Sequence, residues 1–146
     1  MKLAEALNER ADLQKKIASI RERLQHNVLI QEGDTPAESP EELFKQLDSL
    51  IKRFALLIST INKFNLSAGL TDLLATRDAA ILYHSSLSSI LQTLNHSTER
   101  YARNEIKSVR TVNVTDVQDK VDGLAKQIRE LNNEIQRMNW EKDIVI

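Results

Sequence analysis

Apolar residues recur along this chain in alternating steps of three and four positions, the spacing of a helix that packs against other helices. The longest unbroken stretch lies near the C-terminus. Its members are Val114, Val117, Val121, Leu124, Ile128, Leu131, Ile135 and Met138. A mean spacing of 3.5 residues keeps one stripe of a helix facing its partner, so this stretch predicts a helix over about 114–139.

Two further segments carry the same spacing with polar interruptions. They predict helices over about 2–27 and 71–95. The first stripe is Leu3, Ala6, Arg10, Leu13, Ile17, Ile20 and Leu24, and the second is Leu73, Arg77, Ala80, His84, Leu87, Leu91 and Leu94.

A fourth helix is predicted over about 40–65. Ser39-Pro40-Glu41-Glu42 is a strong helix start, because serine can accept from a free backbone N–H and proline suits the first helical position. The main stripe is Leu43, Leu47, Leu50, Phe54, Leu57, Ile61 and Phe64, and a second line holds Phe44, Ile51 and Ile58. One neighbouring helix cannot cover so wide a face, which indicates a bundle core or a subunit contact.

Two segments read as extended, 28–31 and 105–113, the latter rich in β-branched residues. In an up-down-up-down order these segments lie at the same end of the protein, where they can pair. The expected fold is therefore mainly all-α, a single domain over 1–146. It is an antiparallel four-helix bundle, or a pair of long helical hairpins, with a small two-stranded β ribbon at one end.

Composition narrows the classes of function. Only three Gly and two Pro among 146 residues fit an all-helical chain, and a net charge of −1 speaks against a DNA-binding protein. The absence of cysteine excludes disulfides, thiol chemistry and cysteine-type zinc sites. The N-terminus lacks an apolar signal core and no apolar run approaches a membrane span, so we expect a cytoplasmic location and no membrane partner.

Polar residues on the helical stripes are the first candidate site. Arg10 and Arg77, with Asp78 beside the latter, stand where apolar residues are expected and are predicted to share a layer. They form either a site for a small anionic ligand or a salt-bridged layer that fixes helix register. His84 is a further candidate ligand-binding residue. No Glu-x-x-His pair, nucleophile elbow or phosphate loop is present, so we expect no metal, no cofactor, no catalytic residues and no enzyme activity.

A basic segment is the second candidate site. It contains Arg100, Tyr101, Arg103, Lys107 and Arg110. These residues suit a phosphate or a single RNA strand, with the tyrosine stacking on a base. The alternative is a charged strand edge that discourages edge-to-edge pairing.

The chain resembles the bacterial septicolysin-like proteins over nearly its whole length. The residues that carry this resemblance are Met1-Lys2-Leu3-Ala4-Glu5-Ala6-Leu7, Arg10-Ala11-Asp12-Leu13-Gln14, Gln31-Glu32-Gly33, Arg77-Asp78, Arg100-Tyr101, Arg103, Glu105-Ile106-Lys107, Thr111-Val112-Asn113-Val114 and Asn139-Trp140. The family name implies a membrane-active cytolysin, although the family has no settled activity.

The sequence alone predicts assembly rather than chemistry. The first hypothesis is a non-enzymatic cytoplasmic helical protein that self-associates as a dimer or larger closed oligomer, with a possible scaffold role. Two alternatives stay open. One is the cytolysin that the resemblance implies, and the other is an RNA- or phosphate-binding module built on residues 100–110.

Overall fold

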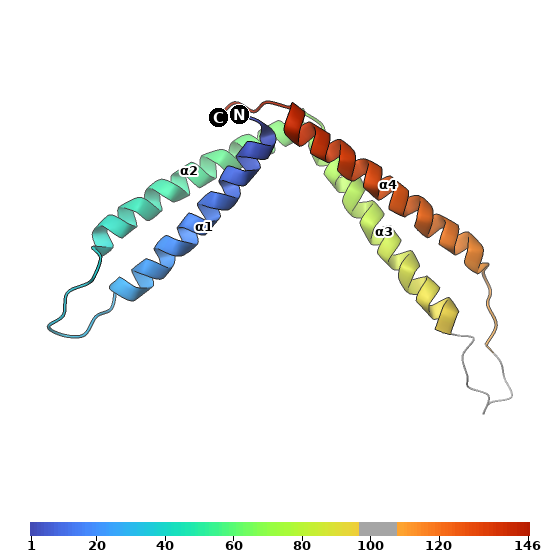
Figure 1. The fold of residues 1–146 in the computed structure, drawn as a ribbon, viewed down its shortest axis with the longest axis horizontal. Helices are drawn as coiled ribbons and strands as arrows, with labels where there is room; N and C mark the ends of the chain where they lie inside the picture. The colour runs from blue at the N-terminus through green and yellow to red at the C-terminus, as the bar shows by residue number, and fades with distance from the viewer. Residues whose placement is uncertain (97–107) are drawn as a thin grey trace. The chain divides into compact units, whose positions relative to one another are not determined.

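The computed structural model describes residues 1–96 and 108–146, and every regular element in these residues is a helix. In chain order the helices are α1 (Leu3–Asn27), α2 (Pro40–Ser67), α3 (Leu70–His96) and α4 (Val114–Glu141), as Figure 1 shows. The all-α class and the four helices are thus confirmed. The prediction of one domain organised as a compact four-helix bundle stays a prediction.

The predicted β ribbon is wrong for the residues that the structure describes. Neither 28–31 nor 108–113 contains a strand, and 105–107 lie outside the described residues. The backbone groups of the first segment are used locally. The amide of Val28 donates to the carbonyl of Leu24, and that of Asp34 donates to the carbonyl of Gln31. β-Branched residues favour strands only where a partner strand is present, and here the chain closes a turn instead.

The chain forms two compact units, and the first contains residues 1–68 and 138–146. We call it unit 1. Its helices α1 and α2 lie side by side as an antiparallel hairpin (Figure 1). Ile20, Leu24 and Leu43 form a buried cluster between them, against which Leu47 and Leu50 pack. The apolar stripes predicted from the sequence therefore do face each other in this hairpin.

The two chain ends close unit 1 at the start of α1. The amide of Leu3 donates to the carbonyl of Lys142 at 3.1 Å, and the amide of Ile144 donates to the carbonyl of Met1 at 2.8 Å. The side chains of Leu3 and Ile144 are both buried. This contact satisfies backbone groups that a helix start otherwise leaves free.

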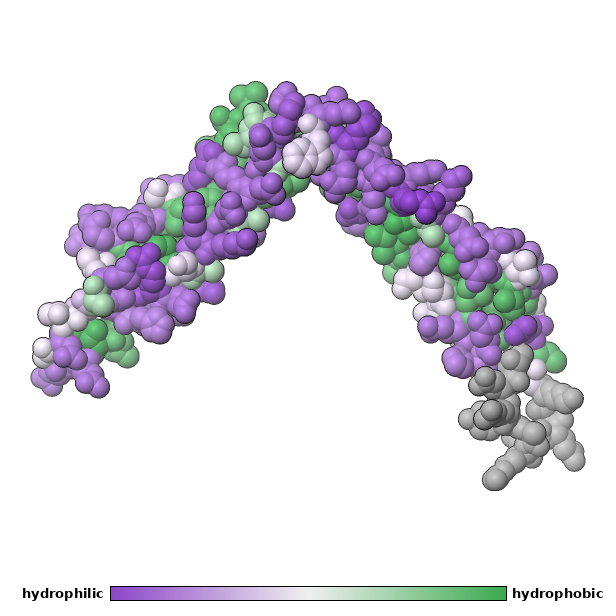
Figure 2. Space-filling view, viewed as in Figure 1, coloured by the Kyte–Doolittle hydropathy of each residue, from purple (hydrophilic) through white to green (hydrophobic). Residues whose placement is uncertain are grey.

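Unit 2 spans Gly69–Arg137 and contains α3 and most of α4. Among its described residues, the buried apolar ones are Leu70, Ala80, Leu91, Val121 and Ile135. Met138, the last stripe residue of α4, is also buried, but Leu124, Ile128 and Leu131 in the middle of the helix are only half-buried. Apolar side chains consequently reach the surface between polar ones along the helices, as the green areas of Figure 2 show.

Local sequence signals explain where the helices begin and end. At the start of α2, the Ser39 hydroxyl accepts from the amide of Glu42 at 3.4 Å, and Pro40 is the first helical residue. Between α2 and α3, Gly69 has φ +73°, a backbone conformation that side chains with a Cβ disfavour. Glycine at this position lets α2 end and α3 begin within three residues.

Candidate functional site

One surface of unit 1 carries a line of apolar side chains on α2 that are not fully buried against α1. We call it the α2 apolar line, and it consists of Phe44, Ile51 and Ile58. Phe44 is 54% exposed and Ile51 is 46% exposed, whereas Ile58 is half-buried. Residues seven apart return to the same face after two helical turns, so the three side chains form one stripe. An apolar stripe that stays in contact with water is a candidate surface for contact with another protein.

Half-buried apolar residues widen this stripe toward α1. Leu47 and Phe54 follow Phe44 and Ile51 by three positions, which places them on the adjoining strip of α2. Ile17 on α1 is also half-buried. A single partner helix thus leaves a broad apolar face partly open to solvent.

An ion pair flanks the α2 apolar line on its other edge. Lys52 Nζ lies 2.7 Å from Asp48 Oδ2, one helical turn away. The hydrogen bond to Asp48 and the charge of its carboxylate raise the pKa of Lys52. The carboxylate of Asp48 and the ammonium group of Lys52 therefore lie beside the line near Ile51, one helical turn apart.

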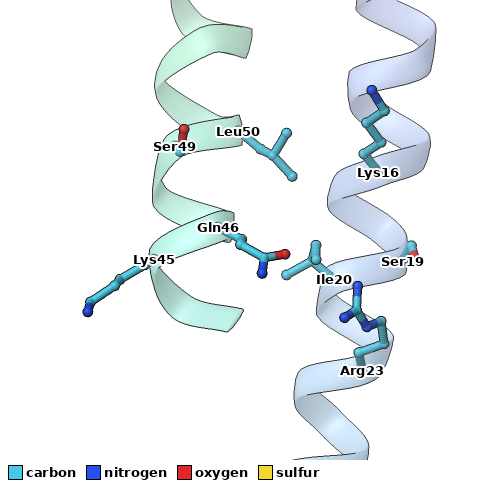
Figure 3. Close-up of a pocket in the computed structure, with 8 residues that line it drawn as sticks. All are labelled: Lys16, Ser19, Ile20, Arg23, Lys45, Gln46, Ser49 and Leu50. Atoms are coloured by element: carbon cyan, nitrogen blue, oxygen red, sulfur yellow. The ribbon is translucent and has the colours of Figure 1, made fainter. Parts of the chain in front are cut away.

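A shallow groove lies on another face of the hairpin. It encloses about 530 Å³ and is lined by Lys16, Ser19, Ile20, Arg23, Lys45, Gln46, Ser49 and Leu50. Figure 3 shows the side chains of Ile20 and Leu50 pointing into the space between the helices, while Lys45 points away from α1. The groove therefore has an apolar floor and polar edges.

Most of the positive charge at the groove is already neutralised within the chain. Lys45 lies 3.3 Å from Glu42 and 3.8 Å from Glu41, and Arg23 binds Glu38. A ligand anion would have to compete with these carboxylates. The groove can hold an apolar group, but its residues do not include a paired acid and base for catalysis.

Arg23 anchors the loop that joins α1 to α2. Its Nε donates to both carboxylate oxygens of Glu38, at 3.1 and 2.9 Å, and its Nη2 also contacts Glu38. These hydrogen bonds lower the pKa of Glu38 and raise the pKa of Arg23. Buried Asn27 completes the arrangement, because its Oδ1 accepts from the amide of Glu38 and its Nδ2 donates to the carbonyl of Arg23.

The two arginines of the first predicted site belong to different units. Arg10 is exposed on α1 in unit 1, while Arg77 is partly buried on α3 in unit 2. Arg77 does contact Asp78, since its Nε and Nη2 donate to Asp78 Oδ1 at 3.3 and 3.2 Å. His84 is half-buried, and its carbonyl accepts from the Ser88 hydroxyl. A layer shared by Arg10 and Arg77 stays a prediction, as does a small anionic ligand there.

Little of the predicted basic site falls within the described residues. Arg100, Tyr101, Arg103 and Lys107 lie outside them. Arg110 is exposed, and its Nε donates to the carbonyl of Leu94 at 3.2 Å. This guanidinium therefore binds the last turn of α3, where carbonyl groups lack helical partners.

The described ranges 1–96 and 108–146 contain neither a cluster of metal ligands nor a helix that could cross a membrane. Within them, no group of three or more His, Asp or Glu side chains could hold a metal ion. No helix described there is long and apolar enough to cross a membrane.

The fold and the surface define an all-α protein whose most conspicuous feature is an exposed apolar helix face. Residues 10–144 match the family of unknown function DUF6847, and the chain belongs to this family. It is also similar to a conserved protein of unknown function from Corynebacterium diphtheriae, known from its crystal structure. The two are 36% identical over 99% of each chain, with a TM-score of 0.79. No curated protein matches the sequence.

Sequence reasoning identified the α2 apolar line but missed the other two features of unit 1. The contact of Arg23 and Asn27 with Glu38 crosses a loop, and nothing in the spacing of these residues marks them as partners. The groove likewise depends on which side chains of two helices face each other. Resemblance to the septicolysin-like proteins stays a prediction, because no comparison bears on it.

Proposed function

We propose that this protein is a non-enzymatic structural component that self-associates through the α2 apolar line. The observation that carries the proposal is the exposure of Phe44 and Ile51, at 54% and 46%, on a helix whose neighbouring stripe packs against α1. Fully burying an apolar side chain of this size gains about 1.5–3 kcal/mol, so covering the half that is still exposed gains roughly 1 kcal/mol per residue. A closed oligomer would remove the whole line from water in every copy.

The half-buried stripe residues of unit 2 support self-association, although they do not themselves point to the α2 apolar line. Leu124, Ile128 and Leu131 lie on the most regular apolar pattern of the chain, yet each keeps part of its surface in contact with water. Seam positions of helical assemblies are normally covered on both sides by facing residues. Their partial exposure indicates that two-helix units do not by themselves bury all the apolar surface that the sequence provides.

Light scattering after size-exclusion chromatography tests the proposal over a range of micromolar concentrations. We expect the wild-type mass to be a multiple of the chain mass of 16.7 kDa. The double substitution Phe44→Ser and Ile51→Ser should weaken association by about tenfold or more, because two apolar contacts are lost. A wild-type protein that is monomeric throughout this range would refute the proposal.

Leu56→Ser is the matched control. Leu56 is 53% exposed on the same helix, but it lies about 140° around the helix axis from Ile51. Replacing it removes about as much exposed apolar surface as one of the two substitutions in the double variant, but from another face. If this variant dissociates the oligomer as strongly as the double variant, the contact does not use the α2 apolar line.

Other functions suggested by the sequence stay predictions. They are a membrane-active cytolysin and an RNA- or phosphate-binding module at residues 100–110. A cytoplasmic location likewise stays a prediction. Dye release from liposomes tests the first. The second is tested by RNA binding before and after alanine replaces Arg100, Arg103, Lys107 and Arg110.

A further inference from the structure

The α2 apolar line has a natural centre. Ile51 lies seven residues after Phe44 and seven before Ile58. When two such lines meet in antiparallel register about Ile51, three contacts form: one between the two Ile51 side chains and two between Phe44 and Ile58. A shift by seven residues leaves one member of each line without a partner. The centred register therefore buries the most apolar surface.

The flanking charges favour the antiparallel orientation. Two antiparallel helices related by a twofold axis bring the same edge of each line together. Lys52 of one copy then lies opposite residue 50 of the other, two positions from the second copy's Asp48 and two from its Lys52. Each Lys52 therefore has two carboxylates nearby, one at 2.7 Å in its own helix and one across the contact, against one like charge. In a parallel pair the Asp48 edge instead faces the strip that contains Leu47 and Phe54. A carboxylate against apolar side chains loses water without gaining a partner.

The half-buried residues on the other edge fit the same arrangement. Leu47 and Phe54 lie between the α2 apolar line and α1, and Ile17 of α1 is half-buried as well. In the antiparallel pair, the two α1 helices lie on the same side of the paired α2 helices. The two hairpins then make a four-helix bundle, in which these three residues are covered from a second direction.

From this geometry we propose that the occupant of the α2 apolar line is the same line of a second copy, in an antiparallel twofold contact centred on Ile51. The inference rests on the proposed self-association and adds its partner surface, orientation and register. An isologous contact of this kind closes on itself and gives a dimer rather than a fibre.

Disulfide formation tests the register, because the natural chain contains no cysteine. In the full-length protein, Ile51→Cys should oxidise to a covalent dimer. The variants Phe44→Cys and Ile58→Cys should each cross-link poorly on their own. When the two proteins are mixed, they should form a disulfide-linked mixed dimer, which is recognised by a mass tag on one of them. In the paired state we expect cross-linking at least about tenfold faster than by random collision at micromolar concentration. The mixed dimer keeps Ile51 intact, so it tests the register independently.

Ser49→Cys is the matched control, since Ser49 is exposed two residues from Ile51 and about 160° around the helix. It should cross-link no faster than collision allows. Self-disulfides of Phe44→Cys and of Ile58→Cys without a mixed dimer would indicate parallel helices and overturn the inference. If the wild type is oligomeric but none of the cysteine variants forms these cross-links, the register is overturned and self-association stands. A wild type that is monomeric by light scattering would overturn both the register and the self-association.

Discussion

An ion pair between Lys2 and Asp143, 141 positions apart in the chain, joins the N-terminal and C-terminal segments of unit 1. Lys2 Nζ donates to Asp143 Oδ2 at 3.0 Å and also contacts the carbonyl of Glu141 at 3.2 Å. The pair is exposed, so its own contribution to stability is small. It marks the place where the C-terminal segment packs on the first turn of α1 and covers Leu3.

The apolar anchor of this segment is Ile144, which is 3% exposed and whose amide donates to the carbonyl of Met1. We expect Ile144→Ala to lower the free energy of unfolding by about 2 kcal/mol or more, because the substitution removes buried methylene and methyl groups and leaves a cavity. Urea denaturation followed by circular dichroism measures the change. Neighbouring Val145 is 90% exposed, so Val145→Ala should change stability by less than about 0.5 kcal/mol. Equal effects of the two substitutions would contradict the packing described for the C-terminal segment.

Two glycines should respond to alanine in opposite directions. Gly69 has φ +73° and no atom lies within 4 Å of the place that a Cβ would take, so the cost of Gly69→Ala is backbone strain alone, about 1–2 kcal/mol of lost stability. Gly123 lies inside α4, and its Cβ position is also open. Gly123→Ala should raise stability by about 0.8–1 kcal/mol, since alanine is the better helix former. Thermal unfolding of both variants gives the signs, and a stabilising Gly69→Ala would show that residue 69 leaves the left-handed region in solution.

The sequence predicted the helices well because their signals are local. The regular stripe from Val114 to Met138 and the Ser39-Pro40 helix start depend on residues a few positions apart, and both correspond to observed elements. The prediction of extended segments was wrong because it also rested on local signals alone. The β-branched residues near Val112 favour a strand locally, but a strand needs a partner, and the residues described there form none.

The candidate site was harder to predict because it depends on tertiary packing. A stripe position indicates which face a residue occupies, not how deeply it is buried. Arg10 stands on the stripe of α1, yet its long charged side chain is exposed, because α2 alone does not enclose that edge of the helix. The exposure of the α2 apolar line, in contrast, could be predicted from the sequence. Three apolar residues beyond the main stripe exceed what one neighbour can cover, and Phe44 and Ile51 are exposed accordingly.

Asn27, the last residue of α1, should be the polar residue on which the loop between α1 and α2 depends most. It is 6% exposed and makes two hydrogen bonds, accepting from the amide of Glu38 at 3.0 Å and donating to the carbonyl of Arg23 at 2.7 Å. Asn27→Ala leaves a part-buried amide without an acceptor, which should lower the free energy of unfolding by about 1–3 kcal/mol. Gln25→Ala, at an exposed position of the same helix, is the control. Hydrogen exchange of the Glu38 amide should accelerate only in the Asn27 variant, and unchanged exchange would show that the amide has another acceptor.

Acidification should weaken unit 1 through Glu38. Hydrogen bonds from Arg23 hold the pKa of Glu38 below its ordinary value of 4.5. A carboxyl group with a lowered folded-state pKa stabilises the fold above its unfolded pKa, and this stabilisation disappears as the pH falls through the folded value. The difference in unfolding free energy between wild type and Glu38→Gln should therefore be constant near neutral pH and shrink below about pH 4.5. Urea titrations of both proteins from about pH 7 to about pH 3 measure it, at low salt because the pair is partly exposed and screened. A difference that grows on acidification would mean that Glu38 is stabilised in its protonated form, contrary to its contacts with Arg23.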